Sequence, residues 1–136
     1  MMPMPVTALY AGVFALFALF LSFKAGSLRG KTGISILYGE PVNWELAENV
    51  RRHQNFLEYV PMIIILMGVI ELNGGSTMLL HVVGVLLFVS RIAHMLGLHA
   101  DNMSHVGRVI GAGGSALLTL VAGGYAVWIG AGALFG

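Results

Sequence analysis

Long apolar segments, separated by polar or glycine-rich stretches, dominate the pattern of this chain. The first runs for eighteen residues without a charge, over 6–23, which at roughly 1.5 Å per residue is close to the roughly 30 Å of a hydrocarbon layer. The second, over 59–70, has only twelve residues. A spanning helix must therefore continue from it back through Glu58 and Asn55, so polar side chains are expected at membrane depth.

Two further apolar segments complete the pattern. A turn with the sequence ELNGGST, residues 71–77, returns the chain into an apolar stretch over 78–98, and another apolar stretch follows Arg108. Along this last segment small residues recur every four positions, which lets another helix approach closely: Gly107, Gly111, Ser115, Thr119 and Gly123. The pattern predicts an all-α integral membrane four-helix bundle with a left-handed up-down arrangement. We expect a single domain over 1–136, with spans at approximately 6–26, 50–72, 77–98 and 107–133.

The composition agrees with a membrane protein and excludes several classes of function. Hydrophobic residues make up 57% of the chain and charged residues 10%, and the mean hydropathy is +0.86. No basic stretch stands apart from apolar sequence, so a nucleic-acid partner is not expected. The chain has no cysteine, which excludes disulfides, thiolate metal sites and a cysteine nucleophile, so any thiol chemistry needs an external thiol.

The positive charges predict the orientation in the membrane. The seven Lys and Arg residues cluster around the first and third connections: Lys24, Arg29, Lys31, Arg51, Arg52, Arg91 and Arg108. The positive-inside rule then places both connections, loops one and three, in the cytoplasm and both termini outside. The N-terminal segment has no positive charge before it, so we interpret it as a retained span rather than a cleaved signal peptide. The short chain without an organelle-targeting signal favours a bacterial inner membrane.

A polar stripe marks the second apolar segment. Arg51, Asn55 and Glu58 are spaced by four and three residues, so they share one face of a helix. Glu58 lies 13 residues before Glu71, and Arg91 lies 14 residues after Thr77, so the two should sit at nearly the same depth.

An ionised carboxylate at membrane depth needs a cation nearby. We therefore predict a contact between Glu58 and Arg91, and by the same count Asn55 should lie level with His94.

The balance of charge around this stripe points to a ligand. Arg51, Arg91 and Arg108 outnumber Glu58 around a pocket that opens toward the cytoplasm, so the pocket would suit a small anionic ligand. Two other classes stay open. A small multidrug or proton-coupled transporter would use a membrane Glu but should be net negative at that site. In a noncatalytic membrane scaffold the polar stripe would only hold the helices together.

The second-segment motif resembles that of a known family. The sequence RRHQNFLEYVP contains an Arg-x-x-x-Asn-x-x-Glu pattern followed by Tyr59 and Pro61. In this, and in its four spans and basic first connection, the chain resembles the MAPEG family, membrane-associated proteins in eicosanoid and glutathione metabolism. The resemblance implies a homotrimer that binds glutathione as a co-substrate between neighbouring subunits near the cytoplasmic side. The lipophilic electrophile would arrive from the lipid bilayer.

The resemblance also implies roles for particular residues. The motif carries the glutathione-binding role to Arg51, Asn55, Glu58 and Tyr59, and matching positions carry it to Arg29, Arg91 and His94. Arg108 matches the Arg that holds the glutathione thiolate, and is the expected catalytic residue. Leu98 stands where eicosanoid-making members have Tyr, and Val109 replaces a small polar residue found in some members. These departures favour general glutathione transferase or peroxidase chemistry over eicosanoid substrates.

The expected mechanism needs no metal. A free thiol has a pKa near 8.5, and a neighbouring Arg in a partly dry site lowers it, so that more thiolate forms at neutral pH. The polar residues His94, His99, Asp101 and His105 gather in the stretch HMLGLHADNMSH, residues 94–105. Their spacings of five, two and four fit no set of ligands on a helix face, so a metal site is not expected there.

Overall fold

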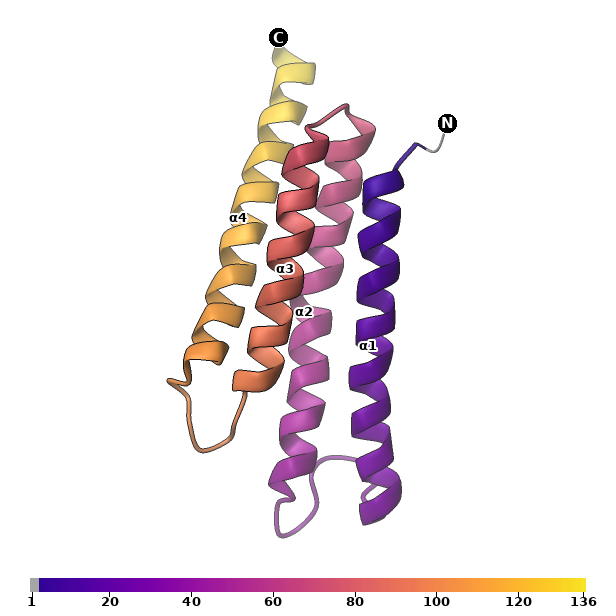
Figure 1. The fold of residues 1–136 in the computed structure, drawn as a ribbon, viewed down its shortest axis with the longest axis vertical. Coiled ribbons are helices and arrows are strands. Elements are labelled where there is room, and N and C mark those ends of the chain that lie inside the picture. The colour runs from indigo at the N-terminus through magenta and orange to yellow at the C-terminus, as the bar shows by residue number, and fades with distance from the viewer. Residues whose placement is uncertain (1–2) are drawn as a thin grey trace.

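The computed structural model describes residues 3–136, and over this range the chain folds into four α-helices with no strand (Figure 1). They are α1 (Pro5–Thr32), α2 (Trp44–Leu72), α3 (Thr77–Gly97) and α4 (Val106–Phe135). Each is long and apolar enough to cross a membrane. The predicted all-α membrane bundle is therefore confirmed.

Local sequence signals set the ends of these helices. Asn43 caps α2 by accepting a hydrogen bond from the N–H of Leu46 at 3.0 Å, and Ser76 caps α3 in the same way. Gly33 ends α1 in the left-handed conformation, with φ of 72°. At the end that carries the first connection, α1 and α2 continue beyond the predicted membrane spans. Polar residues of both helices are thereby presented together at that end.

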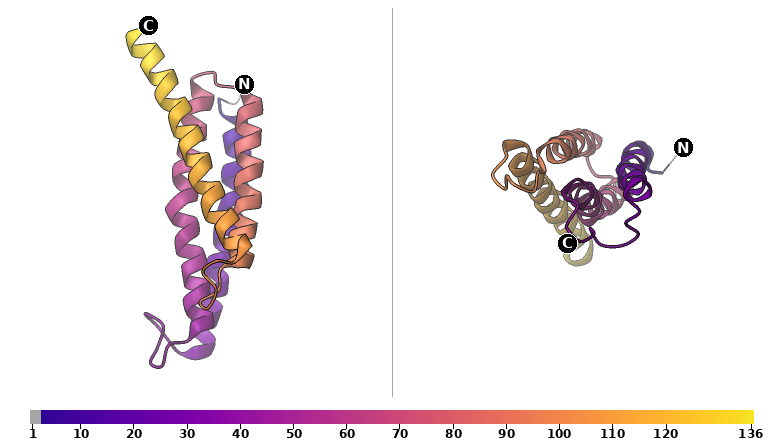
Figure 2. Two further views of the ribbon diagram at one scale, coloured as in Figure 1. Left: turned by 90° about the vertical axis from the view of Figure 1, so that its left-hand side faces the viewer. Right: turned by 90° about the horizontal axis from the view of Figure 1, so that it is seen from below.

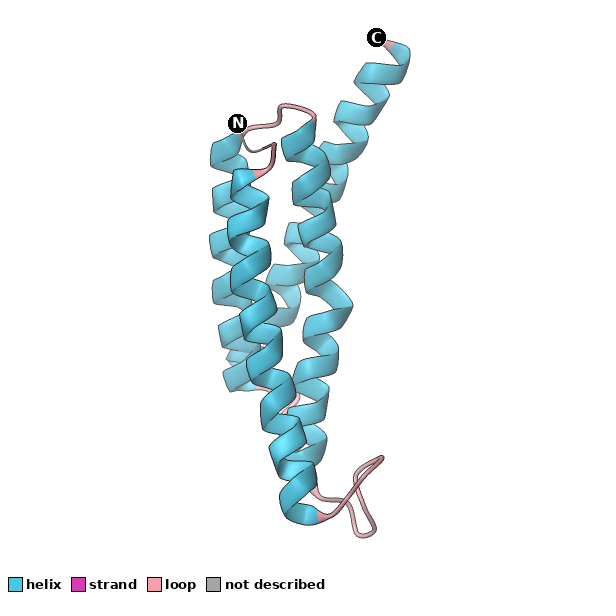
Figure 3. Cartoon of the chain, turned by 90° about the vertical axis from the view of Figure 1, so that its right-hand side faces the viewer, coloured by secondary structure: helices cyan, strands magenta, loops and turns pink. Residues whose placement is uncertain are grey.

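The helices alternate in direction. The start of α1, the α2–α3 turn and the end of α4 lie at one end of the bundle, and the two longer connections lie at the other (Figures 1 and 3). Seen along the bundle, α2 and α3 lie between α1 and α4, and α1 makes no contact with α4 among the described residues (Figure 2). The alternation is the expected up-down arrangement. It places the basic connections, loops one and three, side by side at one end.

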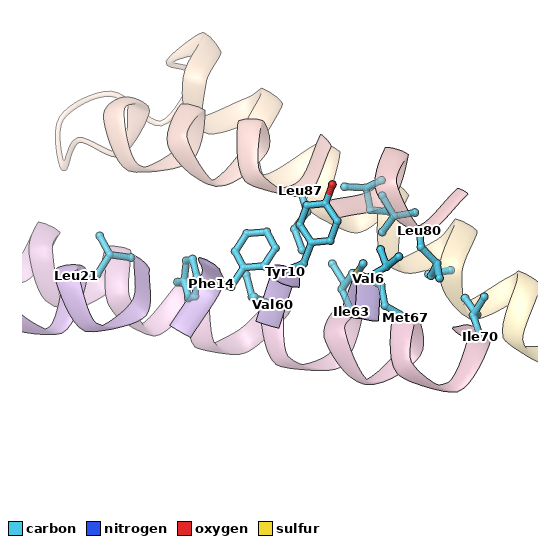
Figure 4. Close-up of a cluster of buried hydrophobic side chains, with 14 residues drawn as sticks. Val6, Tyr10, Phe14, Leu21, Val60, Ile63, Met67, Ile70, Leu80 and Leu87 are labelled. Atoms are coloured by element: carbon cyan, nitrogen blue, oxygen red, sulfur yellow. The ribbon is translucent and has the colours of Figure 1, made fainter. Parts of the chain in front are cut away.

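An apolar core joins α1, α2 and α3 (Figure 4) and also includes Leu118 and Ala122 of α4. Its fully buried side chains include Phe14 of α1, Ile63 and Met67 of α2, and Leu80 and Leu87 of α3. In a membrane the hydrophobic effect contributes little to forming this core, because the surrounding lipid is as apolar as the core itself. Close van der Waals packing therefore holds these helices together.

Glycines bring α4 against α3 near the basic end. A Cβ on Gly97 would lie 2.3 Å from the backbone N of Arg108, and a Cβ on Gly111 would lie 2.3 Å from the Cβ of His94. The predicted small-residue stripe is thus confirmed in its first half, and its partner is α3 of the same chain. A Cβ on Gly123 would meet only a Leu66 methyl at 4.0 Å, because α4 leans away from α3 toward its C-terminal end (Figures 2 and 3).

At the opposite end, Glu71 anchors the start of α1. Its two carboxylate oxygens accept hydrogen bonds from the backbone N–H groups of Val6 at 2.9 Å and Thr7 at 2.7 Å. These N–H groups belong to the first turn of α1 and have no partner within their own helix. A carboxylate from the end of α2 thus caps α1 and complements its dipole.

Replacing Glu71 by alanine is expected to lower the free energy of unfolding by about 1–2 kcal/mol, because α1 loses a charged acceptor for two N–H groups. Unfolding in mixed detergent micelles with increasing SDS would measure the change. Asp101→Ala serves as the control, since Asp101 is exposed and takes part in no ion pair among the described residues. Equal shifts in both variants would contradict the capping role of Glu71.

Candidate functional site

The polar stripe of α2 forms as its spacing predicts. Arg51 and Glu58, two helical turns apart, make an ion pair with Nη1–Oε1 at 2.7 Å and Nη2–Oε2 at 3.3 Å. Asn55 lies between them and donates from Nδ2 to Glu58 Oε2 at 3.5 Å. The side chains of Arg51 and Glu58 are 51% and 47% exposed, so the pair is open to a ligand.

The predicted contact between Glu58 and Arg91 is wrong. Arg91 donates instead from Nη1 to Asn55 Oδ1 at 3.0 Å, and from Nη2 to the backbone carbonyl of Gly111. Asn55 is therefore level with Arg91 and not with His94, so the two helices are offset by about one turn from the counted depth. The predicted depths came from counting residues away from the α2–α3 turn, which assumes that both helices start at the same depth. The count also left out α4, which supplies a carbonyl to Arg91. Glu58 meanwhile finds its cation on its own helix.

Arg91 is enclosed within the subunit. The residue is 2% exposed, its guanidinium carbon lies 5.8 Å from the centre of the Tyr59 ring, and its Nε has no hydrogen-bond partner among the described residues. Neutral acceptors from α2 and α4 therefore hold a cation carried by α3. Because a buried cation without such acceptors is costly, this arrangement fixes the three helices relative to one another.

His94 lies one turn further along α3 and is 5% exposed. It packs against the backbone of Gly111 on α4, at the close approach described above. Asn55, Arg91 and His94 are thus all buried inside the subunit, while Arg51 and Glu58 are exposed.

Arg51 and Arg108 line one cavity at the basic end of the bundle. The cavity has a volume of about 290 Å³, and Tyr38, Trp44 and Leu98 also contribute to its wall. Its volume is at the lower end of the usual range for small-molecule sites. A neighbouring cavity of about 460 Å³ shares Trp44 with it. Arg51 of α2 and Arg108 of α4 therefore line the same cavity, while Glu58, which holds the Arg51 guanidinium, is not among its lining residues.

The position of Arg108 adds to the positive potential of this cavity. Arg108 is the third residue of α4, which begins at Val106, so it lies in the first helical turn. The N–H groups of a first turn carry partial positive charge and attract anions. His105 caps this helix by accepting from the N–H of Gly107 at 3.2 Å. An anion in the cavity would meet both the helix end and the guanidinium.

The structure does not bring Arg29 to the same cavity. Arg29 donates from Nη1 to the carbonyls of Ile34 and Leu37, each at 3.2 Å, and so holds the first connection. It lines a separate cavity of about 280 Å³ with His53 and Gln54, on another face of α2. Within one subunit Arg29 and Arg108 therefore belong to different surfaces.

Sequence reasoning missed the pair that holds the third connection. Glu48 accepts from Arg52 Nη2 at 3.2 Å and from the backbone N–H of Ala100 at 2.8 Å, and Arg52 Nη2 also donates to the carbonyl of Leu98 at 2.6 Å. The spacing of four between Glu48 and Arg52 was the available signal. This pair positions the wall of the Arg51–Arg108 cavity.

The histidines of the third connection form no metal-binding group. His99 and His105 lie edge to face with ring centres 5.6 Å apart, and His99 Nδ1 is 3.9 Å from Glu48 Oε2. Over residues 3–136 no three His, Asp or Glu side chains are placed to hold a metal ion.

Membrane-length helices with a polar stripe and a cationic cavity at one end define an integral membrane protein with an internal polar site. The model of the MAPEG family matches residues 7–128, and the chain belongs to that family, which includes glutathione transferases and peroxidases.

The chain is also similar to curated proteins. Two relatives, each called inner membrane protein YecN, come from Escherichia coli K12 and from Escherichia coli O6:H1. Each is 37% identical over 94 residues, which cover 69% of this chain and 70% of the relative. No solved structure gives a significant match.

Proposed function

We propose that this protein is a glutathione-dependent transferase, with peroxidase activity toward lipophilic hydroperoxides, in which Arg108 stabilises the glutathione thiolate. The observation that carries the proposal is that Arg51 and Arg108, from different helices, line one cavity. Membership of a family that includes such enzymes supports the same conclusion.

The charges of the site complement those of glutathione, which has two carboxylates, one ammonium group and a thiol. Arg51 offers a guanidinium to a carboxylate, and Glu58, half-exposed beside it, accepts from the ammonium. Asn55 and Tyr59 contact Arg91 and would support the site from inside the subunit. Arg91, enclosed in the subunit, acts by orienting Asn55, to which it donates at 3.0 Å. His94 supports this buried group of residues.

Chemistry would occur where the thiol meets Arg108. The guanidinium and the first turn of α4 favour the thiolate over the thiol, which raises the concentration of the nucleophile at neutral pH. The thiolate sulfur attacks an electrophilic carbon, a C–S bond forms, and the leaving group departs with its electron pair. The electrophile enters from the bilayer and glutathione from the aqueous side, so binding both in one site supplies the proximity that the reaction needs.

A complete site is proposed to need a second copy of the chain. Arg29 and Arg108 lie on different surfaces of one subunit, and α1 does not contact α4 among the described residues. A neighbouring subunit could therefore present its Arg29 to the Arg51–Arg108 cavity of the first. The homotrimer implied by the resemblance would provide such a neighbour for every cavity.

The proposed location is a bacterial inner membrane. The similar Escherichia coli proteins are named inner membrane proteins. The helices place both longer connections, which carry or flank the Lys and Arg residues, at one end of the bundle (Figure 1). The positive-inside rule then puts that end, and the site, in the cytoplasm and the termini outside.

The function can be tested with purified protein in detergent, using glutathione and a chromogenic aryl halide. We expect glutathione to raise the thermal unfolding temperature and to be conjugated to the halide. Glu58→Gln should raise the KM for glutathione about tenfold or more, because glutamine keeps an acceptor for the ammonium group but loses the negative charge that strengthens this hydrogen bond. Glu40→Gln, an exposed change in the first connection, should leave the KM unchanged.

Other outcomes identify the competing classes. Stabilisation by lipophilic cations instead of glutathione would support a transporter that uses Glu58. If no small molecule stabilises the protein and no conjugation is seen, the polar stripe only joins the helices, as in a scaffold. Either result would refute the transferase.

A further inference from the structure

A second basic cavity lies between α1 and α2, apart from the one that contains Arg108. It has a volume of about 330 Å³. Its wall includes three cations, Lys24, Lys31 and Arg52, together with the Ser27 hydroxyl and one carboxylate, Glu45. The positive charges therefore outnumber the negative charge in the lining.

The cations of this cavity are poorly neutralised by the protein. Among residues 3–136 neither Lys24 nor Lys31 takes part in an ion pair. Arg52 uses Nη2 toward Glu48 and the carbonyl of Leu98, while its buried Nε has no hydrogen-bond partner in the described chain. The lining thus retains hydrogen-bond donors and positive charge for an anion.

The cavity continues into an apolar surface on the membrane side. Phe23 belongs to its wall and is 74% exposed, and Phe20, one turn further toward the middle of α1, is 45% exposed. Lys24 Nζ lies 5.1 Å from the centre of the Phe20 ring. Leu16 is exposed on the same face of the helix. A ligand with an anionic head and an apolar chain would satisfy both parts.

This cavity lies on a different face of α2 from the proposed glutathione site, although Arg52 reaches from it to Leu98 in the wall of that site. At about 100° per residue, its α2 residues Glu45, Asn49 and Arg52 lie about 120° around the helix from the stripe of Arg51 and Glu58. The same three residues also lie about 120° around α2 from the residues that line the Arg29 cavity. A neighbouring subunit that joins those two faces would therefore leave the Lys24–Lys31 cavity open to lipid.

We propose that the Lys24–Lys31 cavity binds an anionic phospholipid, with the phosphate between the two lysines and Arg52 and an acyl chain along Phe23 and Phe20. Basic pockets between membrane helices near the cytoplasmic surface suit such headgroups. The cavity combines that charge with an exposed apolar path on a single helix face. A soluble phosphate would contact the positive charges and leave the apolar surface of Phe23 and Phe20 without a partner.

Native mass spectrometry of the intact protein in detergent can measure this binding. Dioleoyl phosphatidylglycerol would be titrated in parallel with dioleoyl phosphatidylcholine, which has the same chains and no net charge, and with glycerol phosphate, which has no chains. We expect the anionic lipid to bind about tenfold or more tightly than the neutral one. Lys24→Gln and Lys31→Gln should each weaken it about fivefold.

Arg29→Gln is the matched control, because it removes one positive charge from the same end of α1 but from a different cavity. It should leave the affinity for phosphatidylglycerol within about twofold. An equal loss in all three variants would show diffuse attraction to the basic surface and overturn the proposal. Equal binding of the two lipids would overturn it as well. Glycerol phosphate that competes as well as the whole lipid would assign the cavity to a soluble anion instead.

Discussion

Replacing Arg108 by alanine is expected to lower kcat for glutathione conjugation by about two orders of magnitude. Arg108 supplies a guanidinium at the first turn of α4, facing the same cavity as Arg51. Loss of a group that stabilises negative charge at a reacting atom costs about 10²–10³ in rate in comparable sites. Without Arg108 the bound thiol should return toward its ordinary pKa near 8.5, so less thiolate is present at pH 7.

The pH profile separates this role from simple binding. In the wild type kcat should rise at a lower pH than in Arg108→Ala, because the guanidinium lowers the pKa of the bound thiol. Arg108→Lys keeps the positive charge but loses the planar guanidinium, so its kcat should rise at a pH between those of the wild type and Arg108→Ala. If alanine raised only the KM and left the pH profile of kcat in place, Arg108 would bind glutathione without activating the thiol.

Substituting Gly111 by alanine is expected to give the largest loss of stability, about 3 kcal/mol or more. The added Cβ would lie 2.3 Å from the Cβ of His94, 2.6 Å from its Cα and 2.7 Å from its backbone N. Backbone atoms cannot move aside, so α4 must separate from α3. Overpacking of this kind costs typically about 1–3 kcal/mol.

The separation should also affect Arg91. The Gly111 carbonyl accepts from Arg91 Nη2, and a buried guanidinium that loses an acceptor costs about a further 1.5–3 kcal/mol. Unfolding in mixed SDS micelles would measure the total.

Gly113→Ala provides a matched control, since it makes the same change on the same helix and nothing lies within 4 Å of the added atom. Alanine there should be neutral or stabilise the helix by up to about 1 kcal/mol. Equal losses at both glycines would mean that helix propensity or membrane insertion, and not the contact with α3, explains the effect of Gly111→Ala.

The helices and the stripe were predictable because they depend on local sequence. A run of apolar residues predicts a membrane helix whatever surrounds it, and a spacing of four and three places Arg51, Asn55 and Glu58 on one face. The cap that Asn43 gives to α2 in the structure is an equally local contact. The roles carried over from the MAPEG family to Arg108 and the stripe remain predictions that the kinetic experiments address.

The partners of the charged groups were not predictable in the same way. Depth counting paired Glu58 with Arg91, yet Glu58 pairs with Arg51 and Arg91 with Asn55 and Gly111. A shift of one helical turn was enough to change both partners. Glycine contacts between α3 and α4 set the position of the carbonyl that Arg91 uses, and these contacts depend on side-chain size across two helices.

The sequence by itself determined that this protein spans a membrane with helices and that its Lys and Arg residues gather near one end of the bundle, because hydropathy, helical periodicity and charge are properties of the chain. Only the tertiary structure decided that Arg51 and Arg108 share a cavity while Arg29 faces another. It also decided that Arg91 is enclosed and that Lys24 and Lys31 border a cavity with Arg52. These groupings arise from helix packing, which depends on how the side chains of two or more helices fit together.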